Sequence, residues 1–335
     1  MSLFWLALGL GLATLVLWRP RDPLLIACTV LFTGAACWAA VTTDLIWLYL
    51  AVEASTLASA PIIARGSKAV AYKYLLMNVL GLTASLLAIG IIYKATGGTQ
   101  IGPVPPKEAA LAGALLLVGL GTKAGLVPVH GWLPDAYAFS PAGFTPLFAG
   151  VGTKVALIAL IRALPPLYAS APALAPVTVV IACITMVVGV VAAFGQADLP
   201  RLLAYSSVSQ AGYIALGIGV GGLAAAEMHI ISHGLLKAIL FFCVAVLPGF
   251  KRSRWLGPLF LTAALGLGGV PPMPAFFSKF ALFAAAAQGG YAWAAGVAVG
   301  VSLLTILVLV RAGSRIFLIR EEGGEHGHGM AAADD

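Results

Sequence analysis

Long apolar runs recur along the whole chain, each of roughly 18 residues or more, and such runs leave few folds open to it. Of the 335 residues, 61% are hydrophobic and only 9% are charged, which lies far outside the range of a water-soluble globular domain. The runs lack the alternation of apolar and polar residues that is typical of β-barrel strands. The sequence therefore predicts an all-α polytopic membrane protein.

We expect about eleven transmembrane helices, the first of which is retained because no small-residue cleavage site follows it. The polar, glycine-rich tail, residues 319–335, is expected to be disordered in the cytoplasm. The expected spans are 3–18, 23–41, 44–63, 70–93, 109–132, 142–164, 172–195, 202–222, 225–248, 255–285 and 291–313.

The positions of Lys and Arg near the span ends predict the orientation of the chain, because cytoplasmic loops carry an excess of these residues. One set of alternate loops holds only Lys94, Lys107 and Arg162. The opposite set holds Arg19, Arg21, Arg65, Lys68, Arg201, Lys251, Arg252, Arg254, Arg311, Arg315 and Arg320. We therefore expect the N-terminus outside and the C-terminus in the cytoplasm of a bacterial or archaeal cytoplasmic membrane, or of an equivalent energy-coupling membrane. The same rule explains the net charge of +7 without nucleic-acid binding.

Five lysines stand within the expected spans or at their edges: Lys73, Lys123, Lys154, Lys237 and Lys279. An ammonium group in the membrane interior costs at least roughly 2.5–3.5 kcal/mol, so such residues usually have a function. All of the arginines are assigned to loops, so the basic residues that remain are lysines. Lysine can lose its proton, whereas arginine effectively cannot. This pattern favours a proton relay.

Two expected spans are interrupted by proline-rich stretches, and we place the helix breaks at Pro128 and Pro272. A broken helix inside a membrane must have its freed carbonyls satisfied by protein or water, which suggests a buried polar path. Because the broken spans stand five spans apart, we expect two inverted five-helix repeats, 23–164 and 165–318. Each repeat carries one proline-broken helix, and residues 1–22 form an N-terminal span and loop. Such repeats are typical of transporters.

Two acidic residues of the expected spans are candidates for the relay. Glu53, in the stretch LYLAVEASTLAS, is either a lone carboxyl group hydrogen-bonded at a helix interface or, as we favour, part of a switching ion pair with a buried lysine. Glu227 begins the span 225–248 and is either interfacial or a secondary relay candidate. Lys73 and His130 are further secondary candidates. Asp198 is expected to cap the helix that follows it, so we interpret Asp198 and Arg201 as structural.

His229, His233 and Lys237 are spaced i, i+4 and i+8, so they lie on one face of a helix. Two histidines four residues apart can bind zinc, but the third ligand and the activating glutamate of such sites are missing here. A row of proton-exchanging groups fits better. The cysteines, Cys28, Cys37, Cys183 and Cys243, stand in apolar runs without metal-ligand spacing, so we interpret them as small core residues.

Seven stretches, found in order between about residues 23 and 318, resemble a known family. It comprises the antiporter-like subunits shared by respiratory NADH:quinone oxidoreductase, membrane-bound hydrogenases and multisubunit sodium/proton antiporters. Compared with the roughly fourteen spans usual there, this chain is expected to lack spans at the N-terminus and the last span with its lateral helix. The stretches are LYLAVEASTLAS, AYKYLL, GTKAGLVPVHGWLPDAY, GVGTKVALIALIR, QADLPRLLAYSSVSQAGY, HIISHGLLKAILFF and GVPPMPAFFSKF.

The resemblance implies roles for the residues that match. Glu53 and Lys123 would form a charge pair whose separation and closure gate proton movement, and Lys154 would be the inner relay. His229, His233 and Lys237 would form the central axis of the second half-channel. Lys279 would be the exit-side group.

The resemblance also implies the setting of the chain. It predicts a non-catalytic, proton-translocating subunit of a redox-driven complex, bound to other membrane subunits and through them to a cytoplasmic redox arm. No motif in the chain suggests a quinone pocket, a cluster site or a nucleotide fingerprint. Iron–sulfur clusters, flavin or a nickel–iron site, and quinone are therefore expected only in partner subunits. Two alternatives stay open: a subunit of a secondary Na+/H+ antiporter, and a structural or carbon-uptake complex subunit.

Overall fold

In the computed structural model, residues 1–250 and 255–317 are described, and the predicted disordered tail, 319–335, lies outside them. The described residues form α-helices and no β-sheet, with one isolated bridge between Asp44 and Gln100. The helices are α1 (Ser2–Trp18), α2 (Pro23–Val41), α3 (Leu45–Gly66), α4 (Lys68–Thr96), α5 (Pro106–Ala124), α6 (Leu133–Phe139), α7 (Thr145–Val151), α8 (Lys154–Ser170), α9 (Leu174–Phe194), α10 (Leu199–Gly219), α11 (Leu223–Phe250), α12 (Leu256–Gly268), α13 (Pro274–Gln288) and α14 (Ala292–Phe317).

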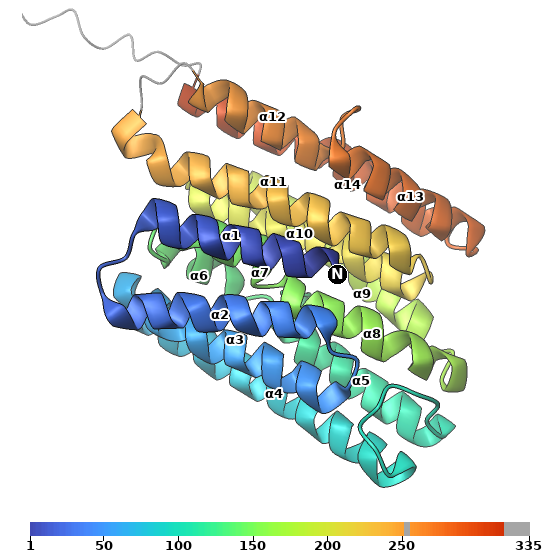
Figure 1. The fold of residues 1–335 in the computed structure, drawn as a ribbon. Coiled ribbons are helices and arrows are strands. Elements are labelled where there is room, and N and C mark those ends of the chain that lie inside the picture. Colours follow the sequence, from blue (N-terminus) through green and yellow to red (C-terminus); the bar gives the residue numbers. More distant parts are fainter. Residues whose placement is uncertain (251–254, 318–335) are drawn as a thin grey trace, which may run out of the picture.

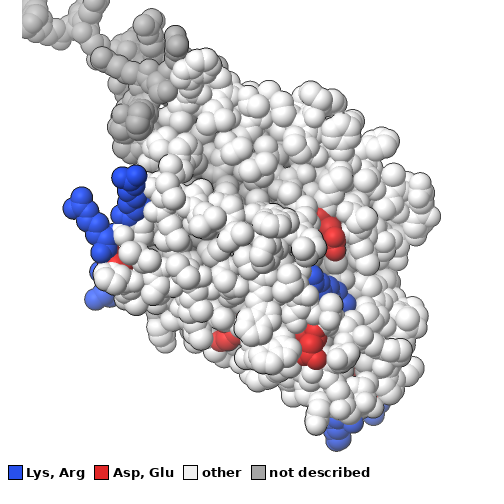
Figure 2. Space-filling view, in the orientation of Figure 1, with Lys and Arg blue, Asp and Glu red and all other residues white. Residues whose placement is uncertain are grey.

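The long helices lie side by side along one common direction (Figure 1). Helices α2 to α5 and α8 fill the lower half of that view, and α9 to α14 fill the upper half. Helix α1 lies between the halves and packs against α2, α7 and α11. Most of the face drawn in Figure 2 is uncharged; basic side chains lie at its left and lower-right margins, and some basic and acidic side chains also lie within its lower and right parts. This distribution suits a bundle whose sides face lipid and whose ends face water.

Seven of the described helical segments are long and apolar enough to cross a membrane. Helices α1 and α12 are apolar but shorter. Each expected span overlaps a helix or a pair of helices, although several bounds differ; the span 109–132, for example, is helical only to Ala124. The expected span 142–164 is one such case, because it divides into α7 and α8 at Gly152 and Thr153 and continues to Ser170.

The two proline-rich stretches interrupt helices. Helix α5 ends at Ala124 and α12 ends at Gly268, and a glycine with positive φ follows each end (Gly125, 78°; Gly269, 91°). A left-handed residue at this position is a common helix stop, because it turns the chain away and needs no Cβ. Pro128 and Pro272 lie in the irregular segments that follow, each after a cis peptide bond.

Two charged residues form hydrogen bonds with backbone groups at helix ends that lack partners within the helix. Asp198 caps α10, as expected, since its carboxylate accepts a hydrogen bond of 3.1 Å from the backbone N–H of Arg201. Arg162, counted above with the basic residues near span ends, lies inside α8, which continues to Ser170. Its guanidinium donates to the carbonyls of Ala39, Ala40 and Thr42 at the end of α2. A cation is favourable there because the last carbonyls of a helix lack partners within the helix.

Candidate functional site

Four of the five lysines singled out by the sequence are buried. The side chains of Lys123, Lys154 and Lys237 are 0% exposed and that of Lys279 is 2% exposed. They come from α5, α8, α11 and α13, so separate helices supply them. Each amine has hydrogen-bond acceptors, as an ammonium group in an apolar interior requires.

Lys123 stands in the last turn of α5, directly before the break. Its Nζ donates to the hydroxyl of Tyr74 on α4 and lies 4.8 Å from the centroid of that ring. The ring of Trp132 lies 5.7 Å from the same Nζ, and the Trp132 indole N–H donates to the carbonyl of Thr122 at 2.7 Å. The break therefore carries Trp132 back over the lysine, so that two aromatic rings enclose the amine.

Glu53 lies on α3 and is not ion-paired with Lys123. Among the residues that the structure describes, three ion pairs are found, and Glu53 belongs to none of them. Its Oε2 is buried and has no hydrogen-bond partner. The carboxyl group and the amine are thus not ion-paired in this structure. The amine instead donates its hydrogen bond to the hydroxyl of Tyr74.

Lys154 is the first residue of α8, and its Nζ donates to the carbonyl of Ala149 in α7. Ala149 is among the last four residues of α7, whose carbonyls lack partners within the helix because the helix ends at Val151. The interruption between α7 and α8 therefore creates the acceptor that holds this lysine.

Helices α7 and α11 approach closely beside this position. A Cβ placed on Gly234 of α11 would lie 2.7 Å from the carbonyl oxygen of Gly150 in α7, and a Cβ on Gly150 would lie 3.2 Å from that of Gly234. Only glycine permits this contact of backbones. Gly234 follows His233, so the contact brings α7, which anchors Lys154, against the helix that carries the histidines.

The histidine face of α11 forms a stacked row. The rings of His229 and His233 lie 6.1 Å apart between centroids, at an angle of 10°. His229 contacts Gln210 of α10 (Nε2 to Oε1, 3.1 Å) and Ser278 of α13 (Nδ1 to Oγ, 2.9 Å). Both ring nitrogens of His233 are buried without a hydrogen-bond partner.

Lys237 continues this row one helical turn further along α11. Its Nζ donates to the carbonyl of Leu203 and to the hydroxyl of Ser206, both on α10, at 2.5 Å each. The amine is therefore held by oxygen atoms of a neighbouring helix and not by a carboxylate. A neutral set of acceptors lets the amine gain or lose a proton without leaving a buried carboxylate unpaired.

Lys279 lies at the other end of the row, beside the second helix break. Its Nζ donates to the carbonyls of Leu267 and Gly268 at 2.9 and 3.2 Å and to the hydroxyl of Ser302 at 3.0 Å. The two carbonyls are the last of α12, so the break supplies them. The ring of Tyr213 lies 4.6 Å from this Nζ, and its centroid lies 5.6 Å from that of His229. Tyr213 thus joins Lys279 to the histidine row.

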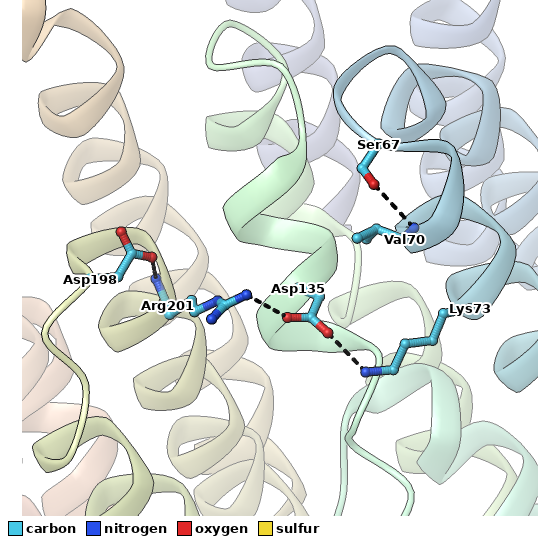
Figure 3. Close-up of polar contacts among 6 residues, drawn as sticks. All are labelled: Ser67, Val70, Lys73, Asp135, Asp198 and Arg201. Atoms are coloured by element: carbon cyan, nitrogen blue, oxygen red, sulfur yellow. Dashed lines mark hydrogen bonds and ion pairs between the residues drawn. The ribbon is translucent and has the colours of Figure 1, made fainter.

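Lys73 lies apart from the buried lysines. Its side chain is 45% exposed and forms an ion pair of 2.8 Å with Asp135 of α6. The other carboxylate oxygen of Asp135 lies 3.3 Å from Arg201 of α10. Figure 3 shows Asp135 between the two cations, joining three helices at the surface. Sequence reasoning overlooked Asp135, although an acidic residue in the first turn of a helix after a break is a recognisable signal.

The two remaining secondary candidates are not brought into the row. His130 is partly buried in the segment after α5, with an unpartnered Nδ1 and its ring 6.4 Å from that of Tyr205. Glu227 is exposed near the start of α11. A groove of about 570 Å³ between α1, α7, α11 and α12 has mostly apolar lining residues, and none of the buried lysines is among them.

Several residues of the site were not predicted from the sequence: Tyr74, Gln210, Tyr213, Ser278 and Ser302. They are the hydrogen-bond and ring partners of the predicted groups. Tyr74 adjoins Lys73, and neighbouring residues of a helix point about 100° apart, so an outward Lys73 is compatible with an inward Tyr74.

His229 and His233 are four residues apart, a spacing at which two histidines can bind zinc. Within residues 1–250 and 255–317, no group of three or more His, Cys, Asp or Glu side chains gathers in a way that could hold a metal ion. Cys28, Cys183 and Cys243 are buried and Cys37 is partly buried, and all are free thiols.

Taken together, the fold defines a multi-pass α-helical membrane protein with two glycine-stopped, proline-bearing helix breaks and buried lysines. Residues 42–305 match the family described as NADH:quinone oxidoreductase/Mrp antiporter, transmembrane. The chain belongs to this family.

Known subunits of NADH-quinone oxidoreductases and of Mrp antiporters resemble this chain. NADH-quinone oxidoreductase subunit N of Desulforudis audaxviator is 37% identical over 301 residues, which cover 81% of this chain and 60% of that protein. A chain of respiratory complex I from Thermus thermophilus superposes with a TM-score of 0.86 at 30% identity, covering 96% of this chain and 77% of that one. A chain of the Mrp complex from Dietzia sp. gives 0.83 at 29%, covering 95% and 67%. This chain thus spans about three fifths of the length of the subunit N relative.

Proposed function

We propose that this chain is a proton-translocating membrane subunit of a redox-driven complex of the NADH:quinone oxidoreductase or hydrogenase type. The observation that carries the proposal is the set of four buried lysines, each held by neutral oxygen atoms. Three of the four stand beside an interruption in a helix. A buried amine with neutral acceptors can exchange its proton, which is the property that a relay needs.

The first half of the relay is gated by Lys123. Approach of the Glu53 carboxylate to the amine favours its protonated form, and withdrawal of the carboxylate favours proton loss. A movement in a neighbouring subunit that alters this separation would release a proton toward Lys154. No covalent chemistry is required of this chain.

The second half of the relay is the row Lys237, His233, His229 and Lys279. The histidine rings are stacked, and the ring of Tyr213 packs beside both His229 and Lys279, so it keeps these groups together without carrying the proton itself. A proton passed from Lys154 to His233 can then move along α11 in either direction. The unpartnered ring nitrogens of His233 suit it to the central position, because one of them can accept a proton while the other can donate its own.

We further propose about eleven membrane spans arranged as inverted repeats, 23–164 and 165–318, with the N-terminus outside and the C-terminus in the cytoplasm. The breaks after α5 and α12 support the repeats, because each lies beside a buried lysine. Lys123 stands in the last turn of α5, and Lys279 donates to a carbonyl at the end of α12. The excess of Lys and Arg in alternate loops supports the orientation. The membrane is the cytoplasmic membrane of a bacterium or archaeon, or an equivalent energy-coupling membrane.

The proposed partners are other membrane subunits and, through them, a cytoplasmic redox arm that carries the iron–sulfur clusters, flavin or nickel–iron site and reacts with quinone. The similarity to subunit N and to a complex I chain supports this assignment. The chain itself would hold no cofactor and would contact only lipid, protons and its partner subunits.

The proposed function predicts that Lys123→Ala abolishes proton translocation while assembly is kept. The amine is the only group that this change removes from the gate, and the aromatic rings around it remain. Proton uptake into vesicles containing the whole complex should fall to background, measured with a pH-sensitive dye. Lys73→Ala is the matched control, because Lys73 is an exposed lysine on the neighbouring helix. Full pumping by Lys123→Ala would exclude the mechanism.

A second candidate is a subunit of a secondary Na+/H+ antiporter without redox partners. The similarity to a chain of the Mrp complex favours it. Against it, Glu53 is the acidic residue proposed for the relay, and sodium prefers several oxygen ligands. Mass spectrometry of the co-purifying chains distinguishes the two: iron–sulfur or nickel–iron subunits favour the first function, and only small membrane subunits favour the second.

A further inference from the structure

The phenol of Tyr74 is fully buried between two helices that hold charged or titratable groups of the gate. Its oxygen accepts a hydrogen bond from Lys123 of α5 and lies 2.7 Å from the hydroxyl of Ser59 on α3. Ser59 in turn donates to the carbonyl of Ser55 at 2.8 Å. Glu53 lies on the same helix as Ser59 and six residues earlier, a rise of about 9 Å. Tyr74 therefore links the amine to the helix that carries the carboxyl group.

The directions of these hydrogen bonds depend on the charge of Lys123. A protonated amine has only donors, so the phenol must accept from it and give its own hydrogen to Ser59. A neutral amine has a lone pair and can accept from the phenol, which then accepts from Ser59. The pair Tyr74 and Ser59 can thus satisfy both states of the amine by turning two hydroxyl hydrogens.

The Glu53 carboxylate is the second acceptor that we consider for the amine. Oε2 of Glu53 is buried and unpartnered, which is costly for a polar atom, so this oxygen would gain from pairing with the amine. Trp132 closes the other side of the amine by its ring and offers no acceptor. The phenol is thus the hydrogen-bond acceptor of Lys123 in this structure, and the Glu53 carboxylate is the acceptor that we propose for the closed gate.

We infer that Tyr74 is a positioning residue that holds Lys123 whenever Glu53 is withdrawn, so that the amine alternates between the phenol oxygen and the carboxylate. The inference rests on the proposed function and adds to it the partner of the amine in the open state of the gate. Without the phenol hydroxyl, a protonated amine released by Glu53 would have only aromatic rings beside it.

The test is Tyr74→Phe in the complete complex, which keeps the ring over the amine and removes only the hydroxyl. The initial rate of proton uptake into vesicles should fall about tenfold, the size expected for loss of one hydrogen bond to a charged group. The alkaline limb of the pH–rate profile should move to lower pH, because the protonated amine loses an acceptor. Tyr72→Phe is the matched control, since Tyr72 lies on the same helix and is 69% exposed.

Ser59→Ala provides a second variant in case Tyr74→Phe fails to assemble. It leaves the phenol in place and removes the acceptor of its hydrogen, so it should lower the rate about threefold and move the profile in the same direction. An unchanged rate and pH profile in both variants, or in Ser59→Ala alone if Tyr74→Phe does not assemble, would overturn the inference. Lys123→Ala measured in parallel separates the two ideas, because continued pumping in that variant contradicts the proposed function itself.

Discussion

At the scale of single residues, the buried lysines are held by hydroxyls and by carbonyls at helix ends, and not by carboxylates. Lys279 shows this most clearly, since two carbonyls of α12 and the hydroxyl of Ser302 accept from it. Such contacts admit two explanations for the lysine. It could serve as a permanent cation that closes the end of α12, or as a group that exchanges its proton.

The substitution Lys279→Arg distinguishes these explanations. Arginine keeps the positive charge and the donors but effectively never loses its proton. If Lys279 exchanges its proton, proton uptake should fall at least tenfold in Lys279→Arg while the thermal stability of the complex stays near that of the natural protein. Loss of stability in Lys279→Ala but normal pumping in Lys279→Arg would identify a structural cation instead.

At the scale of helices, interruptions place acceptors and aromatic side chains around the lysines. The break after α5 returns Trp132 over Lys123, and the end of α7 offers the carbonyl of Ala149 to Lys154. The close contact of Gly150 with Gly234 then joins α7 to α11. Helix packing in membranes depends on such small residues, since burial of apolar surface from lipid gives little driving force.

Gly234→Ala tests this contact. The added methyl group would meet the Gly150 carbonyl oxygen at 2.7 Å, so α7 and α11 must separate, and we expect a loss of about 1–3 kcal/mol of stability. Gly296→Ala on α14 is the control, because nothing lies within 4 Å of its Cβ position. Thermal unfolding of the purified complex measures both. Equal unfolding temperatures would contradict the importance of this contact.

At the scale of the whole molecule, the charged residues mark the ends of the bundle. Asp135 joins Lys73 and Arg201 at the surface, and both cations belong to the end that we assign to the cytoplasm. Exposed ion pairs of this kind contribute only about 0–1 kcal/mol each, so we assign this group a role in holding α4, α6 and α10 together at that end, not in conduction.

The orientation of the molecule is testable with introduced cysteines. Gln100→Cys and Ala197→Cys place thiols at exposed positions in loops that we assign to opposite sides of the membrane. A membrane-impermeant maleimide added to intact cells should label Gln100→Cys and should label Ala197→Cys only after lysis. The natural cysteines are buried or partly buried, so a variant without the partly buried Cys37 gives a clean background. The reverse pattern would invert the assigned topology.

Much of this architecture follows from local properties of the chain. Apolar runs require helices in a membrane, a glycine followed by proline stops them, and the spacing of His229, His233 and Lys237 puts these residues on one face whatever surrounds them. Lysines far from span ends can likewise be recognised as buried candidates. Lys73 is the exception, because its place near the start of α4 lets it reach the surface and Asp135.

The partners across helix interfaces depend on how the helices pack, and helical periodicity says nothing about which helix lies opposite. Tyr74 facing Lys123, Gln210 facing His229 and Arg162 closing the end of α2 all join residues distant in the chain. The separation of Glu53 from Lys123 is of the same kind. Complementary charge makes that pair possible, but the position of α3 relative to α5 sets the distance between the two groups, and here the phenol holds the amine.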